Sequence, residues 1–372
     1  MLYGLPLCIL DNSRNPYQNR AKLILCFLPF FCIKVHPQEE TIMEKSRSRN
    51  SCVTCILWSM VILLCVVTPI IGSAAWFGTK IYNIAVATPT PISTCEGMLE
   101  AMLHGFFLPD GEKVVTDSLH ELVVYQVSGD QISNPNLLPA PDNLKPFQAD
   151  LPTQQRIWDY FVRIIPPENR SEITQYKIIS DGTGNFNAQV YIEAKWDQNS
   201  TTEKWTLLVD QADFVNERQY TTTLLHEFGH MLTLNINQMD YSLTAENCPR
   251  YFKDPGCSKP NTYLQLFYDR FWAGIYDEWR AVSSSVDPTQ VKIDLKTFYD
   301  AHPKDFVSEY ATTAAHEDIA ESWMKFVLAP KSAGETLAEK KVAFFYEFPE
   351  LVQIRSEVIG LLCRYNNLPP LQ

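Results

Sequence analysis

Basic residues are in short supply in this 372-residue chain, which has 31 Lys and Arg against 43 Asp and Glu and a formal net charge of −12 at pH 7. The imbalance is not uniform. Residues 1–94 carry eight basic and four acidic residues (+4), which leaves 23 basic and 39 acidic residues (−16) for residues 95–372. The acidic part therefore lacks the basic face that nucleic-acid binding requires, and we expect no nucleic-acid partner.

Histidine is also scarce, with seven residues, and the sequence has no internal repeat. Aromatic residues, by contrast, are abundant throughout the acidic part, which excludes an intrinsically disordered chain. A segment of about 275 residues with this composition can bury a large hydrophobic core.

The longest stretch without any charge covers residues 52–77, is apolar on every face and is long enough to cross a bilayer as a helix. Three basic residues at positions 45–49 precede it and only Lys80 follows closely, so we expect the C-terminal body outside the cytoplasm. Small residues at 72–75 also suit signal-peptidase cleavage, and both a retained anchor and a cleaved signal peptide stay open. The expected location is extracytoplasmic, either membrane-anchored through residues 52–77 or secreted.

These features divide the chain into four parts. Residues 1–42 form an N-terminal extension without a usable pattern, and Met43 begins a signal peptide or transmembrane anchor over residues 43–77. Residues 78–98 are rich in Pro and Thr, which predicts a linker. Residues 99–372 are expected to form the folded domain.

Hydrophobic periodicity predicts strands near the start of this domain and helices toward its end. We expect strands at 122–127 and 204–209, the second at a sheet edge, and a hairpin whose arms are residues 176–180 and 188–194. The helices expected from apolar spacing are 153–165, 217–234, 263–282, 313–328 and a pair within 335–365 separated near Pro349. This order of strands and then helices predicts an α+β fold.

Six of the ten cysteines lie at or before position 65, and the exported part keeps four. An even number in an oxidising compartment predicts two disulfides, for which three pairings are possible. Cys248 and Cys257 bracket a loop that contains Pro and Gly, so we expect these two to pair. Cys95 and Cys363 would then tie the start of the domain to its end.

The string with the strongest chemical meaning is His226-Glu227-Phe228-Gly229-His230, on the helix expected at 217–234. Histidines at i and i+4 lie on one helix face, so both imidazoles can reach one zinc ion. Glu227 then falls beside the open coordination position, where it can accept a proton from the attacking water. The alternative is a buried helix whose histidines are merely hydrogen-bonded, because HExxH should occur by chance in roughly one such chain in a hundred.

A catalytic zinc site needs a third protein ligand. The metzincin pattern would place a third histidine at position 236, but Thr233 and Ile236 occupy the Gly and His positions and exclude that family. The segment FVSEYATTAAHEDIAESWMKF, residues 306–326, instead places two glutamates four apart on one helix face. Together with HEFGHMLTLN it resembles a group of exported bacterial zinc-binding metallopeptidases of the gluzincin type, over residues 205–328.

The resemblance implies a zincin-like fold with a small mixed sheet, an active-site helix and C-terminal helices. It implies that Zn²⁺ is held by His226, His230 and Glu317, while Glu321 hydrogen-bonds the far nitrogen of a zinc-binding histidine. This sequence departs from the family in having His316 instead of Asn before the ligand and Glu321 instead of Asp. The separation of 87 residues between His230 and Glu317 is also long. For the two glutamates, a solvated helix face is the alternative interpretation.

Three other residues are candidates for a place at the site. Tyr310 could donate its hydroxyl to a developing oxyanion, although a packed side chain is the alternative. His316 and His302 are candidates for substitute ligands or transition-state donors, with an ordinary surface or core histidine as the alternative for each.

These observations predict an extracytoplasmic zinc metallopeptidase that hydrolyses a peptide or protein substrate with Glu227 as general base. The alternative is a catalytically silent, membrane-tethered binding or structural protein with the same fold. Glu227 favours the enzyme, since a degenerate site often loses this residue. An intramembrane protease is excluded because His226 lies far from residues 52–77.

Overall fold

The structure, a computed structural model, describes residues 94–104, 115–183, 188–192, 203–214 and 216–369. The predicted extension and the predicted signal or anchor segment lie outside these residues. Within the described part of the chain, no helix combines the length and the apolar character needed to cross a membrane.

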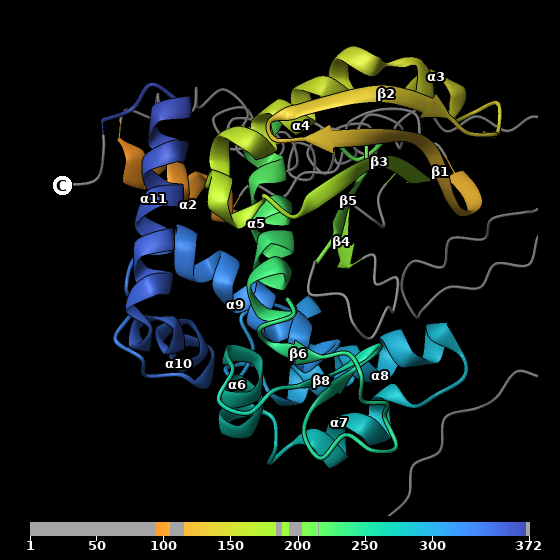
Figure 1. Cartoon of the computed structure of the whole chain (residues 1–372). Helices are drawn as coiled ribbons and strands as arrows, with labels where there is room; N and C mark the ends of the chain where they lie inside the picture. Colours follow the sequence, from red (N-terminus) through yellow and green to blue (C-terminus); the bar gives the residue numbers. More distant parts are fainter. Residues whose placement is uncertain (1–93, 105–114, 184–187, 193–202, 215, 370–372) are drawn as a thin grey trace, which may run out of the picture. The chain divides into compact units, whose positions relative to one another are not determined.

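The described part contains helices and strands in the mixture expected for an α+β fold (Figure 1). The strands are β1 (Val115–Ser128), β2 (Gln131–Leu137), β3 (Ile173–Gly182), β4 (Ala188–Ile192), β5 (Trp205–Asp210), β6 (Met239–Asp240), β7 (Phe252–Lys253) and β8 (Gly256–Ser258). The α-helices are α2 (Cys95–His104), α3 (Lys145–Ala149), α4 (Leu151–Ile164), α5 (Glu217–Thr233), α6 (Tyr263–Phe271), α7 (Tyr276–Ser283), α8 (Pro288–Ala301), α9 (Ala315–Leu328), α10 (Leu337–Ala343) and α11 (Pro349–Tyr365). Short 3₁₀ turns are η1 (Pro167–Asn169), η2 (Tyr310–Thr312) and η3 (Phe344–Glu347).

The main sheet has the strand order β2-β1-β3-β5-β4. β1 pairs with β2 and β3 in antiparallel fashion, β3 and β5 run parallel, and β4 is antiparallel to β5. The predicted hairpin between 176–180 and 188–194 is therefore wrong, because β5 lies between β3 and β4. The neighbours of β3 are β1 and β5. The next strand in the chain, β4, therefore lies beyond β5 at the edge of the sheet.

The expectation that residues 204–209 form an edge strand is also wrong. β5 is flanked on both sides, and all six of its residues are buried. A strand buried on both faces shows a continuous apolar run instead of alternation, which describes WTLLV well. Immediately after β5 the chain turns into α5, so the interior position of this strand places the following helix against the sheet.

The residues at the two ends of α4 explain where this helix begins and ends. The Asp150 side chain accepts a hydrogen bond from Thr153 N, and Pro152 occupies the first turn. Its buried face carries Ile157, Trp158 and other residues at helical spacing, and the helix stops before Pro166. The helix predicted over 153–165 is confirmed.

Two disulfides close the domain, and both predicted pairs are confirmed. Cys95–Cys363 joins α2 to α11 across a sequence separation of 268, with the two Cα atoms 5.5 Å apart. Because α2 begins at Cys95, the last four residues of the predicted 78–98 linker belong to a helix of the folded part. Cys248–Cys257 has a sequence separation of only 9 and closes a loop that contains β7. β7 pairs with β8, and β8 also pairs with β6, in a small antiparallel sheet.

The aromatic segment predicted as one helix over 263–282 is broken into α6 and α7. Trp272 lies at the break, fully buried, and its indole Nε1 donates to Asp318 Oδ2 at 2.8 Å. Gly274 follows, and glycine lowers helix propensity. The break turns this tryptophan toward α9, so this part of the aromatic segment serves the core.

Helix α8 was not predicted, although its start carries a recognisable signal. Asp287 precedes Pro288, and its carboxylate accepts from Thr289 N at 2.9 Å. An acidic N-cap followed by proline at the first helical position is a strong start signal. Phe298 is its one buried side chain, so the apolar face that periodicity detects is weak in this helix.

Candidate metal centre

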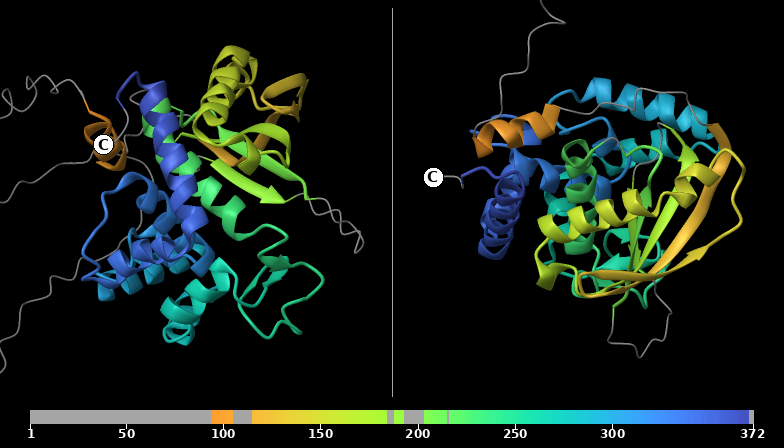
Figure 2. Two further views of the ribbon diagram at one scale, coloured as in Figure 1. Left: turned by 60° about the vertical axis from the view of Figure 1, so that its left-hand side comes forward. Right: turned by 90° about the horizontal axis from the view of Figure 1, so that it is seen from above.

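Helix α5 presents the two histidines of the HExxH string. In Figures 1 and 2 this helix lies between the sheet and α11. Leu224, Leu225 and Phe228 are completely buried and fix the helix in the core, while the histidines each keep 6% exposure. Both histidines are thus buried side chains on a rigidly packed helix, which fixes where their rings lie.

Helix α9 supplies the two glutamates and crosses α5 at very short range. Gly229, inside the HExxH string, marks the crossing, because a Cβ there would stand 3.0 Å from the Cα of Ala320 and 3.1 Å from a Trp323 ring atom. Behind the glutamates, Asp318 is fully buried and forms an ion pair with Lys341 at 2.6 Å. The start of α9 is thus anchored from its far side while its near side faces α5.

The three candidate ligand atoms form a nearly equilateral triangle. His226 Nε2 and His230 Nε2 are 3.1 Å apart, and Glu317 Oε2 lies 3.0 Å from the first and 3.1 Å from the second. Three corners of a tetrahedron around zinc, with bonds of about 2.0–2.1 Å, are about 3.3 Å apart. The spacing is close to what zinc requires, and two histidines with one glutamate are a donor set of catalytic zinc sites.

Glu321 contacts the ring nitrogen of His226 that lies outside the triangle. Its Oε1 lies 2.8 Å from His226 Nδ1, and its Oε2 accepts a hydrogen bond from the Ser308 hydroxyl at 2.6 Å. Because an ionised carboxylate only accepts, the hydrogen of the neutral His226 ring lies on Nδ1, and the lone pair of Nε2 then points into the triangle. Carboxylate partners of this kind fix the tautomer of metal-binding histidines.

The electrostatics of the group follow from burial and from these hydrogen bonds. Burial lowers the pKa of His230 to about 4, so this ring is neutral at pH 7. Burial acts in the same direction on His226, but hydrogen bonds to Glu317 and Glu321 outweigh it and raise its pKa well above the usual value. Burial would also raise the pKa of Glu317, yet the surrounding histidines hold it well below its ordinary range. A charged carboxylate is what a metal ligand needs.

Glu227 and Tyr310 both lie close to the triangle. Glu227 is buried, with 5% exposure, and its charge acts on the pKa of both His226 and Tyr310. The Tyr310 ring is 5.5 Å from the His226 ring and keeps 53% exposure. Desolvation of its hydroxyl, together with Glu317 and Glu227, raises the pKa of Tyr310, so the hydroxyl stays protonated and can donate a hydrogen bond.

The structure separates the two other candidate histidines. His316 lies against the triangle, with Nε2 3.1 Å from Glu317 Oε1, and burial lowers its pKa. His302 is held elsewhere by Asp305 at 3.0 Å and Glu278 at 3.3 Å, and it is not part of the ligand group. The hypothesis that His302 is a substitute ligand therefore finds no support in its position.

A second group of acidic side chains was not singled out from the sequence. Asp181, Asp210 and Asp213 bring carboxylate oxygens within 4.8 Å of one another at the ends of β3 and β5. Asp210 is fully buried and accepts hydrogen bonds from Asp181 N at 3.0 Å and Ala212 N at 2.8 Å. It thus holds together the turn that leads into α5.

The raised pKa of Asp210 predicts how the stability of the fold depends on pH. Burial raises its pKa to about 8 in the folded protein, against about 3.9 in an unfolded chain. Its contribution to stability is therefore complete below about pH 4 and is lost as the pH rises toward 8. We expect Asp210→Asn to reduce the fall in the free energy of unfolding between pH 5 and pH 8, measured by urea denaturation. Equal pH slopes for both proteins would contradict this assignment.

Sequence reasoning missed Gly229, Ser308 and Tyr251 as parts of the site. Gly229 was visible inside HEFGH, but its role depends on which helix crosses there. Ser308 sits thirteen residues before Glu321, and Tyr251 hydrogen-bonds His316 at 3.0 Å from within the disulfide loop. No local pattern marks these contacts, because each joins separate elements.

Comparison with protein-family models, curated proteins and solved structures finds no match for this chain.

Proposed function

We propose that this protein is an extracytoplasmic zinc metallopeptidase of the gluzincin type, with His226, His230 and Glu317 as metal ligands. The observation that carries the proposal is the triangle of ligand atoms with edges of 3.0–3.1 Å, built from a histidine pair on α5 and a glutamate on α9. The contact of Glu321 with His226 Nδ1 supports it, because this is the outer-shell partner that zinc-binding histidines use. The two disulfides support an oxidising compartment.

A zinc ion held by these residues would lower the pKa of a bound water to about 7 and polarise the substrate carbonyl. Glu227 supplies the proton transfer: its carboxylate accepts the proton of the attacking water and passes it to the leaving amine. Tyr310 would donate its hydroxyl to the oxygen on which negative charge develops. Glu321 keeps the His226 ring in one orientation during these steps.

Zinc content tests the proposal directly. The purified full chain is expected to hold one zinc per molecule. Glu317→Ala should lose nearly all of it, because only two ligands remain. Glu321→Ala should keep zinc but bind it about 10–100-fold more weakly, because the far nitrogen of His226 loses its partner. Metal content is measured by atomic absorption after dialysis, and affinity by competition with a chelator.

Glu357→Ala is the matched control, since Glu357 lies on α11 and hydrogen-bonds Gln353 on the same helix. This variant should bind zinc like the wild type. Folded wild-type protein that takes up no zinc when zinc is supplied would reject the metallopeptidase proposal. Equal zinc content in the wild type and Glu317→Ala would reject the ligand assignment.

A further inference from the structure

The two carboxylate oxygens of Glu317 have different neighbours. Oε2 faces the histidine pair of α5, while Oε1 lies 3.1 Å from His316 Nε2 on the adjacent residue of α9. A carboxylate with both oxygens free can rotate and offer either one or both to a metal. Here Oε1 is already engaged by His316.

His316 is in turn held at its other nitrogen. Tyr251 Oη lies 3.0 Å from His316 Nδ1. Because the Glu317 carboxylate only accepts, the hydrogen of the neutral ring is on Nε2, and Nδ1 accepts from the tyrosine hydroxyl. The three residues thus form a chain of hydrogen bonds that all run in one direction, from Tyr251 through His316 to Glu317.

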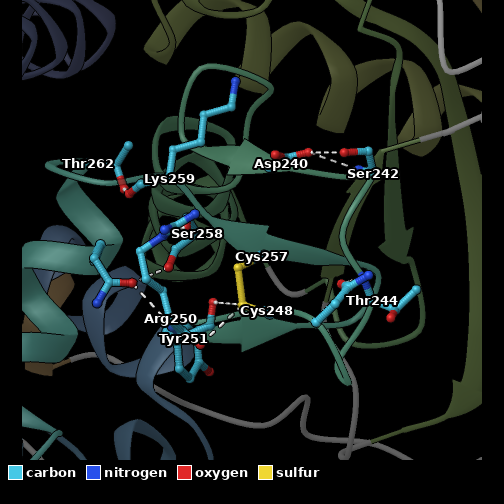
Figure 3. The surroundings of a disulfide bond; sticks show 12 residues. Asp240, Ser242, Thr244, Cys248, Arg250, Tyr251, Cys257, Ser258, Lys259 and Thr262 are labelled. Carbon is cyan, nitrogen blue, oxygen red and sulfur yellow. Dashed lines mark hydrogen bonds between the residues drawn. A yellow bond between two sulfur atoms is a disulfide. The ribbon is translucent and has the colours of Figure 1, made fainter.

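Tyr251 is a fixed starting point for this chain. It is 5% exposed, its N–H donates to Gln265 Oε1 at 3.2 Å, and its carbonyl accepts from Ser258 N at 2.9 Å. Figure 3 shows it inside the loop closed by Cys248–Cys257, with Ser258 on the neighbouring strand. Its ring packs on that of Tyr268, with centroids 4.9 Å apart. The position of the hydroxyl is therefore set by the disulfide loop and by α6.

We propose that Tyr251 and His316 are positioning residues that hold Oε1 of Glu317, so that this ligand presents a single oxygen to the metal. The proposal rests on the proposed function of the site as a zinc centre. It assigns a role to the loop of residues 248–257, which supplies no ligand but fixes the orientation of one. It also gives His316 a role other than ligand or transition-state donor.

The test is a double-mutant cycle on zinc affinity, measured in the purified full chain by competition with a chelator. His316→Leu removes the donor to Glu317 and is expected to weaken zinc binding about 10–100-fold, as loss of an outer-shell partner does. Tyr251→Phe removes one hydroxyl and is expected to weaken it about tenfold. In the double variant the tyrosine change should add nothing, because its effect passes through the histidine.

Conservative variants separate positioning from general packing. His316→Gln keeps an N–H donor near the place of Nε2 and should restore most of the affinity that His316→Leu loses. Tyr268→Phe is the matched control, because it removes a hydroxyl from the ring packed on Tyr251, and its affinity should equal that of the wild type. Cobalt substitution adds a spectroscopic readout, since a Glu317 free to bind through both oxygens raises the coordination number and weakens visible absorption.

The outcomes distinguish this proposal from the one on which it rests. A wild type that binds one zinc, with unchanged affinity in Tyr251→Phe and His316→Leu, overturns the positioning role and leaves the metal centre intact. A tyrosine effect of the same size with and without His316 also overturns it, because the effect would then be structural. A wild type that binds no zinc overturns both proposals.

Discussion

Replacing Glu227 with glutamine is expected to lower peptide hydrolysis by about 10²–10⁴-fold while leaving one zinc bound per chain. Glutamine has nearly the same shape, but its amide cannot accept a proton from the attacking water, and general base catalysis is worth about this factor. Glu227 is not among the three grouped ligands, so metal content should not change. Turnover is measured on a mixture of unstructured peptides with product detection by mass spectrometry, and zinc by atomic absorption.

Three results are informative for this variant. Loss of hydrolysis with zinc retained supports the role of Glu227 as general base. Equal hydrolysis by wild type and Glu227→Gln would reject that role. A zinc-loaded wild type that cleaves no peptide would instead favour a catalytically silent protein with an intact metal site. Glu357→Ala, which changes a glutamate on α11, serves as the control for turnover as well.

Removing the Cys95–Cys363 disulfide is expected to cost about 5.5 kcal/mol of unfolding free energy. The chain-entropy relation for a cross-link depends on the length of the loop it closes, and this separation is 268 residues. The variant is Cys95→Ser with Cys363→Ser, and the measurement is urea denaturation. A chelator is present so that bound metal does not add to stability.

The second disulfide provides the comparison. Cys248–Cys257 spans 9 residues, and the same relation gives about 2.5 kcal/mol for its removal by a matching pair of serines. The long-range disulfide should therefore cost about twice as much. An equal loss for both pairs would show that entropy of the unfolded chain is not the main source of stability from Cys95–Cys363.

Local sequence signals were sufficient for part of the fold and the site. Two histidines four residues apart must share a face of any helix they occupy, so the pair on α5 followed from spacing alone. Helix α4 was bounded by its apolar period and by Pro166. The loop of residues 248–257 contains Pro and Gly between its cysteines, and its closure leaves only one pairing for the other two.

The rest depended on contacts between separate elements. A turn signal at residues 181–184 is compatible with a hairpin, but which strand pairs with β3 is decided by burial of β5 on both faces. Tyr251, the first residue of the hydrogen-bond chain that ends at Glu317, lies 65 residues before His316 in an irregular loop. The carboxylate group around Asp210 likewise forms only when the ends of β3 and β5 come together.

The close crossing of α5 and α9 at Gly229 also limits the size of the ion that the proposed metal centre could hold. Helix α5 carries the two candidate nitrogen ligands and α9 the candidate oxygen ligand. At their closest point Gly229 of α5 packs directly on Ala320 of α9. The proposed zinc ion, with bonds of about 2.0–2.2 Å, needs ligand atoms that lie close together, whereas calcium, with bonds of about 2.3–2.6 Å, needs them further apart. A larger residue at Gly229 would therefore push α5 and α9 apart and, with them, the candidate ligand atoms that the two helices carry.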